Sequence, residues 1–120
     1  MQSRGIRGAI TVESNTREAI SEATVELLDK MLQSNFIYPE DISHVIFTMT
    51  DDLNAAYPAK YARENLGWNA VPLVCFQELS VDNSLKMCLR VLIVVNTGKS
   101  QQEIRHVYLK GAQKLRPDLT

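Results

Sequence analysis

The 120-residue sequence is poor in cysteine and in long apolar runs, and both shortages narrow the class of protein it can encode. Its two cysteines, Cys75 and Cys88, have no C-x-x-C motif and no histidine pair beside them, so we expect neither a zinc site nor a disulfide framework. The longest strongly apolar run, 91–95, is far shorter than the ~20 residues of a membrane helix. The amino-terminal residues lack the apolar segment of a signal peptide. We therefore expect a cytoplasmic protein without membrane contact.

A large excess of one charge is also absent. The chain has 13 Lys and Arg against 14 Asp and Glu, for a net charge of -1. A protein that coats itself in nucleic acid usually has a strongly basic domain, so no nucleic-acid partner is expected. The net charge does not bear on a small local cationic pocket. The length suits one domain, residues 1–120, with a core of its own. P-loop, G-x-G-x-x-G, H-E-x-x-H and Ser-His-Asp patterns are missing, so we expect no covalent or metal chemistry.

Hydrophobic periodicity predicts an α+β (α/β-like) fold with one mixed sheet packed with two main helices. Strands are expected at 6–12, 42–50, 71–79, 85–96 and 104–109, and helices from about 17 to 35 and from 56 to 66. Gly5 and Gly8 in the first strand indicate a close approach by another part of the chain.

The helix ends carry recognisable signals. Asn15 or Thr16 is expected to cap the first helix, and Glu18, three residues after Asn15, suggests a variant of the capping box. Asp52 or Asn54 is expected to cap the second helix, with Pro58 in its first turn. Gly67 is expected to end it.

Charged residues inside apolar strands are the best candidates for function. Arg90 interrupts the run from Cys88 to 95, and a buried guanidinium needs a partner; it is either solvated on a wet face or aimed into a cleft, where it suits a carboxylate. Arg7 lies between two glycines, and Glu78 can pair with either arginine or simply end its strand. Tyr108 fits a core position and a ligand contact equally well.

Five segments together resemble chorismate mutase, in its monofunctional trimeric class rather than its all-helical class. Nearly the whole chain is covered, and the segments stand in the order and spacing of the family. They are RGIRGAITVE at 4–13, FTMTDDLNAAYPAKYAR at 47–63, VPLVCFQE at 71–78, CLRV at 88–91, and IRHVYLKGAQKLRPDL at 104–119.

The resemblance implies a homotrimeric pseudo-α/β-barrel with active sites between subunits. It also implies the conversion of chorismate, a small dicarboxylate, to prephenate on the route to phenylalanine and tyrosine. That reaction is an intramolecular Claisen rearrangement, which requires no cofactor, metal, nucleophile or general base.

The resemblance further implies the roles of particular residues. Arg90 contacts the breaking ether oxygen and a carboxylate, Arg7 and Tyr108 hold a carboxylate, and Glu78 and Cys75 contact the ring hydroxyl. Further substrate contacts are expected from Tyr57, Ala59, Lys60 and Arg63 of the neighbouring subunit, and from Val74 and Leu115. Tyr57 stands where the family favours Phe, and Val74 where Thr is common.

Two other functions compete with this reading. Small trimeric imine or enamine deaminases have a similar fold and also use arginine to bind carboxylates. A non-catalytic trimer that senses an aromatic-pathway metabolite would be stabilised by chorismate without turning it over.

Overall fold

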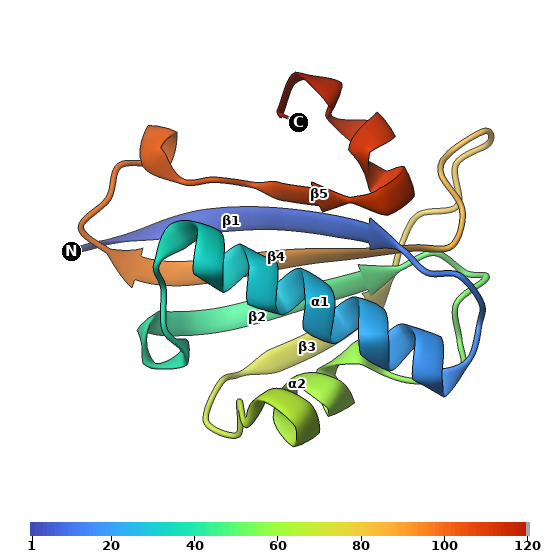
Figure 1. Cartoon of the computed structure of the whole chain (residues 1–120), viewed down its shortest axis with the longest axis horizontal. Coiled ribbons are helices and arrows are strands. Elements are labelled where there is room, and N and C mark those ends of the chain that lie inside the picture. The colour runs from blue at the N-terminus through green and yellow to red at the C-terminus, as the bar shows by residue number, and fades with distance from the viewer. Residues whose placement is uncertain (120) are drawn as a thin grey trace.

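The computed structural model describes residues 1–119, which form one mixed β-sheet with two helices (Figure 1). The strands are β1 (Gln2–Thr11), β2 (Ile42–Met49), β3 (Leu73–Gln77), β4 (Cys88–Thr97) and β5 (Val107–Leu109). Their order across the sheet is β3-β2-β4-β1-β5. The central strand β4 is antiparallel to both β1 and β2, whereas the outer pairs β2–β3 and β1–β5 are parallel. This confirms the predicted mixed sheet with two main helices.

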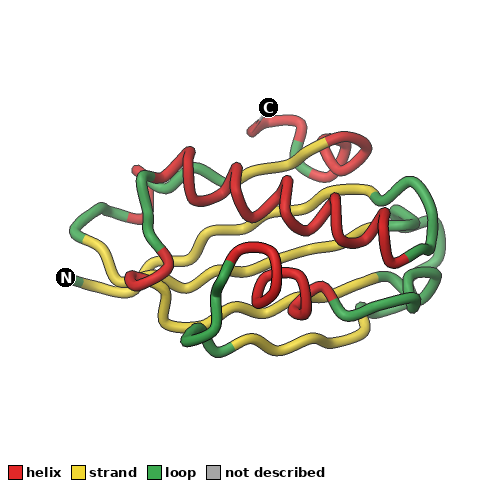
Figure 2. Tube along the Cα trace, turned by 60° about the horizontal axis from the view of Figure 1, so that its bottom comes forward, coloured by secondary structure: helices red, strands yellow, loops and turns green. Residues whose placement is uncertain are grey.

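Both helices, α1 (Arg17–Asn35) and α2 (Pro58–Leu66), lie on the same face of the sheet (Figures 1 and 2). Apolar side chains at helical spacing, from Ile20 to Met31, form one stripe along α1. This stripe is buried and packs with the alternate residues of β1, β2 and β4 that point toward it. The largest fully buried side chains of this core include Phe47, Ile6, Leu27, Leu28 and Met31. None of the helices that the structure describes is long and apolar enough to cross a membrane.

The opposite face of the sheet carries neither α1 nor α2, and we call it the open face. Within residues 1–119, one end of this face is covered, where Ala9, Cys88, Tyr108 and Ala112 form a small second cluster. Apolar side chains are left partly or largely exposed elsewhere on this face: Val74 (46% exposed) and Phe76 (56% exposed) on β3, with Ile46 and Leu92 half-buried on the central strands. Such a contiguous apolar surface is typical of a face that packs against another molecule.

The helix caps were predicted only in part. Thr16 caps α1 by accepting a hydrogen bond from the Ala19 N–H at 3.1 Å, so the capping box from Asn15 to Glu18 is wrong. Asn15 Oδ1 instead accepts from the N–H groups of Asn54 and Ala55, both at 2.9 Å. These two hydrogen bonds connect the start of α1 to the loop before α2.

At α2 the predicted caps Asp52 and Asn54 are wrong, because the helix begins later, at Pro58, and Tyr57 is its N-cap without a side-chain bond. The Asp52 carboxylate accepts the N–H of Met87 and the hydroxyl of Thr50. Pro58 in the first turn and Gly67 at the end, with φ of 73°, are as predicted.

Four strands are shorter than predicted, and β2 is so by a single residue, since it ends at Met49 rather than 50. β4 starts at Cys88 rather than 85, because Met87 has a positive φ of 52° and its N–H is taken by Asp52. β3 keeps only Leu73–Gln77 of the predicted 71–79, and β5 keeps only Val107–Leu109 of 104–109. β1 is longer than predicted, because it pairs with β4 from Gln2 onward.

Replacing Gly8 with alanine is expected to lower the free energy of unfolding by about 1–3 kcal/mol, because overpacking forces buried neighbours to move. A Cβ at Gly8 would overlap Met31 Sδ and lie 2.9 Å from its Cε, and Met31 is fully buried. Gly5→Ala is the matched control, since its Cβ would lie 3.4 Å from Leu92 Cδ1, an ordinary contact. Denaturant unfolding of both variants measures the difference, and equal losses would contradict the predicted overlap.

Candidate active site

A pocket of about 440 Å³ opens on the open face, and we call it the arginine pocket. Its charged members come from three places: Arg7 on β1, Arg90 on β4, and Arg116 between the two short 3-10 turns Lys110–Leu115 and Pro117–Leu119. Uncharged side chains complete it, namely Ile46, Thr48, Leu92, Tyr108 and Leu115. A pocket with three guanidinium groups suits a ligand with several negative charges.

Arg90 is held in place by Glu78. Its Nε lies 2.6 Å from Glu78 Oε1, and Thr48 Oγ1 donates to the same oxygen at 3.2 Å. The Glu78 N–H bonds Met49 O at 2.9 Å, which fixes the carboxylate just beyond the end of β3. Arg90 Nε is buried and has no hydrogen-bond partner of suitable angle among the described residues, so its link to Glu78 is an ion pair.

The Arg90 side chain nevertheless remains 40% exposed, against 19% for Glu78. The ion pair therefore fixes one edge of the guanidinium, and the exposed part is free to meet a ligand in the pocket. The alternative that Arg90 is merely solvated on a wet face does not fit this geometry.

Arg7 and Tyr108 also line the arginine pocket, and they lie on the neighbouring strands β1 and β5. Tyr108 is buried at 9% exposure, whereas Arg7 is exposed. Arg116 forms a two-pronged ion pair with Asp118, at 3.1 and 2.9 Å. This pair lowers the pKa of Asp118 below its ordinary value, so the carboxylate is charged at neutral pH.

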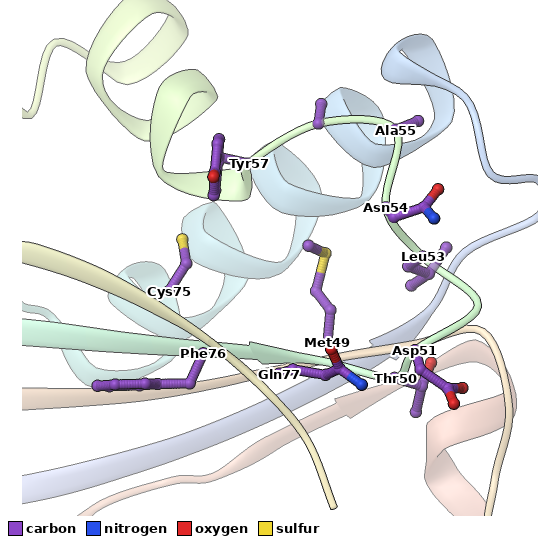
Figure 3. A pocket seen from close by; sticks show the side chains of 11 residues that line it. Met49, Thr50, Asp51, Leu53, Asn54, Ala55, Tyr57, Cys75, Phe76 and Gln77 are labelled. Atoms are coloured by element: carbon purple, nitrogen blue, oxygen red, sulfur yellow. The ribbon is translucent and has the colours of Figure 1, made fainter. Parts of the chain in front are cut away.

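A second pocket, of about 500 Å³, lies between the loop before α2 and strand β3; we call it the Tyr57 pocket. Figure 3 shows Cys75 and Met49 pointing toward the segment that carries Leu53 and Tyr57. Cys75 packs against the helix-covered core, whereas Arg90 points to the open face. The structure therefore groups Cys75 with Tyr57 rather than with Arg90.

Burial raises the pKa of the Cys75 thiol, an effect that the Ala59 backbone and the Arg63 guanidinium only partly oppose. Burial likewise raises the pKa of Cys88 to about 11, despite the opposing charge of Arg90. Both side chains are thus neutral thiols at pH 7. A neutral thiol donates a weak hydrogen bond but is a poor nucleophile.

The remaining candidates follow α2 and β3. Ala59 is buried, whereas Lys60 is half-buried with its Nζ 5.9 Å from the centre of the Tyr61 ring, and Arg63 is exposed. Val74 lies on the open face, one residue before Cys75. None of these four residues lines either pocket, but the Ala59 backbone and the Arg63 guanidinium interact with Cys75, which lines the Tyr57 pocket.

The structure thus divides the predicted site into two groups. Arg7, Arg90, Tyr108 and Leu115 line the arginine pocket, with Glu78 bound to Arg90. The other candidates lie on or beside α2 and β3: Tyr57 and Cys75 line the Tyr57 pocket, Ala59 and Arg63 interact with Cys75, and Lys60 and Val74 line neither pocket. Sequence reasoning missed Thr48 and Arg116 as pocket residues. Alternation along β2 gave a signal for Thr48, and Arg116 directly follows the candidate Leu115.

Comparison with known proteins decides the family. The sequence matches the family Chorismate mutase type I over residues 3–119. The chain belongs to this family. It is 48% identical over 120 residues to chorismate mutase AroH of Bacillus subtilis (strain 168), with 100% of this chain and 94% of that protein covered. It is 53% identical over 117 residues to chorismate mutase AroH of Thermus thermophilus, with 97% and 95% covered.

A chorismate mutase from Clostridium thermocellum has the same fold, with a TM-score of 0.89 and 46% identity over 92% of this chain and 97% of that one. The chorismate mutase resemblance noted in the sequence is thereby confirmed. These matches do not favour the imine or enamine deaminase alternative.

Proposed function

We propose that this protein is an isomerase that converts chorismate to prephenate, the reaction after which its family is named. The observation that carries the proposal is Arg90, whose guanidinium is anchored by Glu78 at the wall of a pocket that also contains Arg7 and Tyr108. Chorismate carries two carboxylates, and guanidinium groups bind carboxylates through paired N–H donors.

The proposed mechanism begins with selection of the reactive conformer. The two ends of chorismate form a bond only in a compact, chair-like geometry. Binding a carboxylate to Arg7 and Tyr108 while Arg90 binds elsewhere on the molecule favours that geometry, and holding reacting atoms in place lowers the entropic part of the barrier.

Arg90 then acts on the transition state. Negative charge develops on the ether oxygen as the C–O bond breaks, and a cation already fixed beside that oxygen stabilises the transition state more than the ground state. The ion pair with Glu78 supplies this fixation. Glu78 and the neutral Cys75 thiol are the proposed partners of the ring hydroxyl, as acceptor and donor.

We further propose that each active site forms between two copies within a homotrimer. The two residue groups lie in different pockets of one chain, one on the open face and one beside the helices. A single small ligand reaches both only if the arginine pocket of one copy meets the Tyr57 pocket of another. The apolar open face, with exposed Val74 and Phe76, supports such packing.

Cytoplasm is the proposed compartment of the enzyme. Both cysteines are free in the structure, which suits a reducing compartment. We propose no resident cofactor, since the rearrangement is intramolecular.

Purified protein is expected to consume chorismate with no added cofactor, measured as loss of its ultraviolet absorbance and appearance of prephenate. Arg90→Ala protein purified in the same way is the control for contaminating host mutase. Absence of turnover at micromolar enzyme would refute the proposal. Thermal stabilisation by chorismate without turnover would instead identify the protein as a metabolite sensor.

A further inference from the structure

Side chains, rather than a strand, complete the outer edge of β1 near its start. The backbone of β5 pairs with β1 only from Gly8 to Ile10. At Gly5 the side-chain amide of Gln101 takes over, accepting the N–H at 3.1 Å and donating to the carbonyl at 2.8 Å. At Arg7, between these two, the backbone N–H donates to Nδ1 of His106 at 2.9 Å. The imidazole therefore stands where a strand carbonyl would otherwise lie.

His106 is itself held in place from α1. Asn35, the last residue of that helix, is fully buried. Its side chain accepts the Arg105 N–H at 2.7 Å and donates to the Arg105 carbonyl at 2.9 Å and to Met31 O at 2.8 Å. Both backbone groups of the residue before His106 are thus fixed, so the position of the imidazole is built into the fold.

The bond to Arg7 requires one protonation state of His106. A backbone N–H is only a donor, so Nδ1 must present a lone pair, and the ring is neutral with its proton on Nε2. An imidazolium has N–H groups on both nitrogens. Its Nδ1–H would face the Arg7 N–H, and two donors form no hydrogen bond.

The surroundings of His106 favour the neutral ring. The charged groups that face it or share its pocket are Arg7 on β1, Arg116 with its partner Asp118, Lys30 on α1 and the adjacent Arg105, while Tyr108 lies two residues along the chain. Burial, with the charges of Arg7 and Arg116, lowers the pKa of His106 below its ordinary value.

We infer that His106 is a positioning residue: its neutral imidazole holds the backbone of Arg7 so that the guanidinium stays in the arginine pocket, and protonation releases it. The inference rests on the proposed function, in which Arg7 binds a substrate carboxylate. A consequence for that function is that the substrate carboxylate binds less tightly when the pH falls low enough to protonate His106.

His106→Ala and His106→Asn separate the lone pair from the rest of the ring. Asn can place its Oδ1 near the position of Nδ1 and does not titrate. At pH 7.5 we expect His106→Ala to raise KM for chorismate about tenfold with kcat nearly unchanged, the size of one lost hydrogen bond. His106→Asn is expected to restore most of the affinity. A wild-type KM in His106→Ala would overturn the inference.

The pH profile tests the protonation step. Between pH 7.5 and 5.5 the KM of the wild type is expected to rise while that of His106→Asn stays flat; carboxyl groups with ordinary pKa values near 4 remain ionised over this range. His44→Asn, which removes the only other imidazole in the sequence, is the matched control and is expected to follow the wild type. A KM that falls on acidification, or a His106→Asn profile like that of the wild type, would overturn the inference.

Nuclear magnetic resonance of ¹⁵N-labelled protein gives a readout that does not depend on turnover. At pH 7.5 Nδ1 of His106 is expected to be the unprotonated nitrogen, and the Arg7 amide proton is expected to titrate with the midpoint of the ring. A protonated Nδ1, or an Arg7 amide that ignores the titration, would overturn the inference even in an active enzyme. An inactive protein that shows the coupled titration would refute the proposed function but retain the bond from His106 to Arg7.

Discussion

Arg90→Lys is expected to lower kcat for chorismate by about 100- to 1,000-fold, the usual effect of removing one preorganised donor from a developing negative charge. Lysine keeps the positive charge but loses the planar fork. In the structure one edge of that fork faces Glu78, at 2.6 Å, and the rest is exposed toward the pocket. A single ammonium group is poorly suited to bind Glu78 and to reach the substrate oxygen at the same time.

The kinetic constants identify the kind of interaction that is lost. A contact made mainly in the transition state lowers kcat and kcat/KM together, whereas a contact made equally in the ground state raises KM alone. Arg17→Lys, at an exposed position at the start of α1, is the matched control and is expected to leave both constants unchanged. Near-normal kcat in a folded Arg90→Lys protein would contradict the proposed role of Arg90.

The sequence predicted those parts of the structure that depend on neighbours along the chain. The stripe from Ile20 to Met31 identified α1 because helical periodicity is a local property. Arg90 stood out because a charge within an apolar strand requires a partner, and the structure provides Glu78. Pro58 and Gly67 located α2 through backbone preferences that act within a single turn.

Features that depend on pairing across the fold were not predictable in this way. Asn15 looked like a cap for its own helix, but its partners are Asn54 and Ala55, about forty residues away. Asp52 looked like a cap for α2, but it binds the N–H of Met87 across the loop before β4. Short polar side chains have several local and distant options, and the tertiary structure decides among them.

The division of the site was equally hidden from the sequence. Cys75 and Glu78 lie only three residues apart, yet Cys75 faces the helices beside Tyr57 and Glu78 joins Arg90. The strand ends at Gln77, between the two residues, so alternation alone does not relate their directions. Only the paired sheet shows that the candidates fall into two groups in one chain.

This division leads to a prediction with a large effect: two inactive variants are expected to restore activity in mixed assemblies. Arg90→Ala disables the arginine pocket. The double change Lys60→Glu with Arg63→Glu reverses two charges on α2, where Arg63 interacts with Cys75 of the Tyr57 pocket, so that α2 repels a dianion. Each variant alone is expected to retain about 1% of wild-type activity or less, given the size of such electrostatic effects. Each still carries one intact half of the site.

Unfolding and refolding the two variants together in equal amounts is expected to recover about a quarter of wild-type activity, because in a cyclic assembly that share of contacts joins two intact halves. Arg90→Ala mixed with Arg7→Ala is the matched control. Both changes lie in the arginine pocket, so no chain in this mixture has an intact arginine pocket, and no recovery is expected. Native mass spectrometry of tagged chains establishes that mixed assemblies form. If they form without activity, or if the control mixture recovers equally, the site does not lie between copies, and the two pockets of one chain must serve separate purposes.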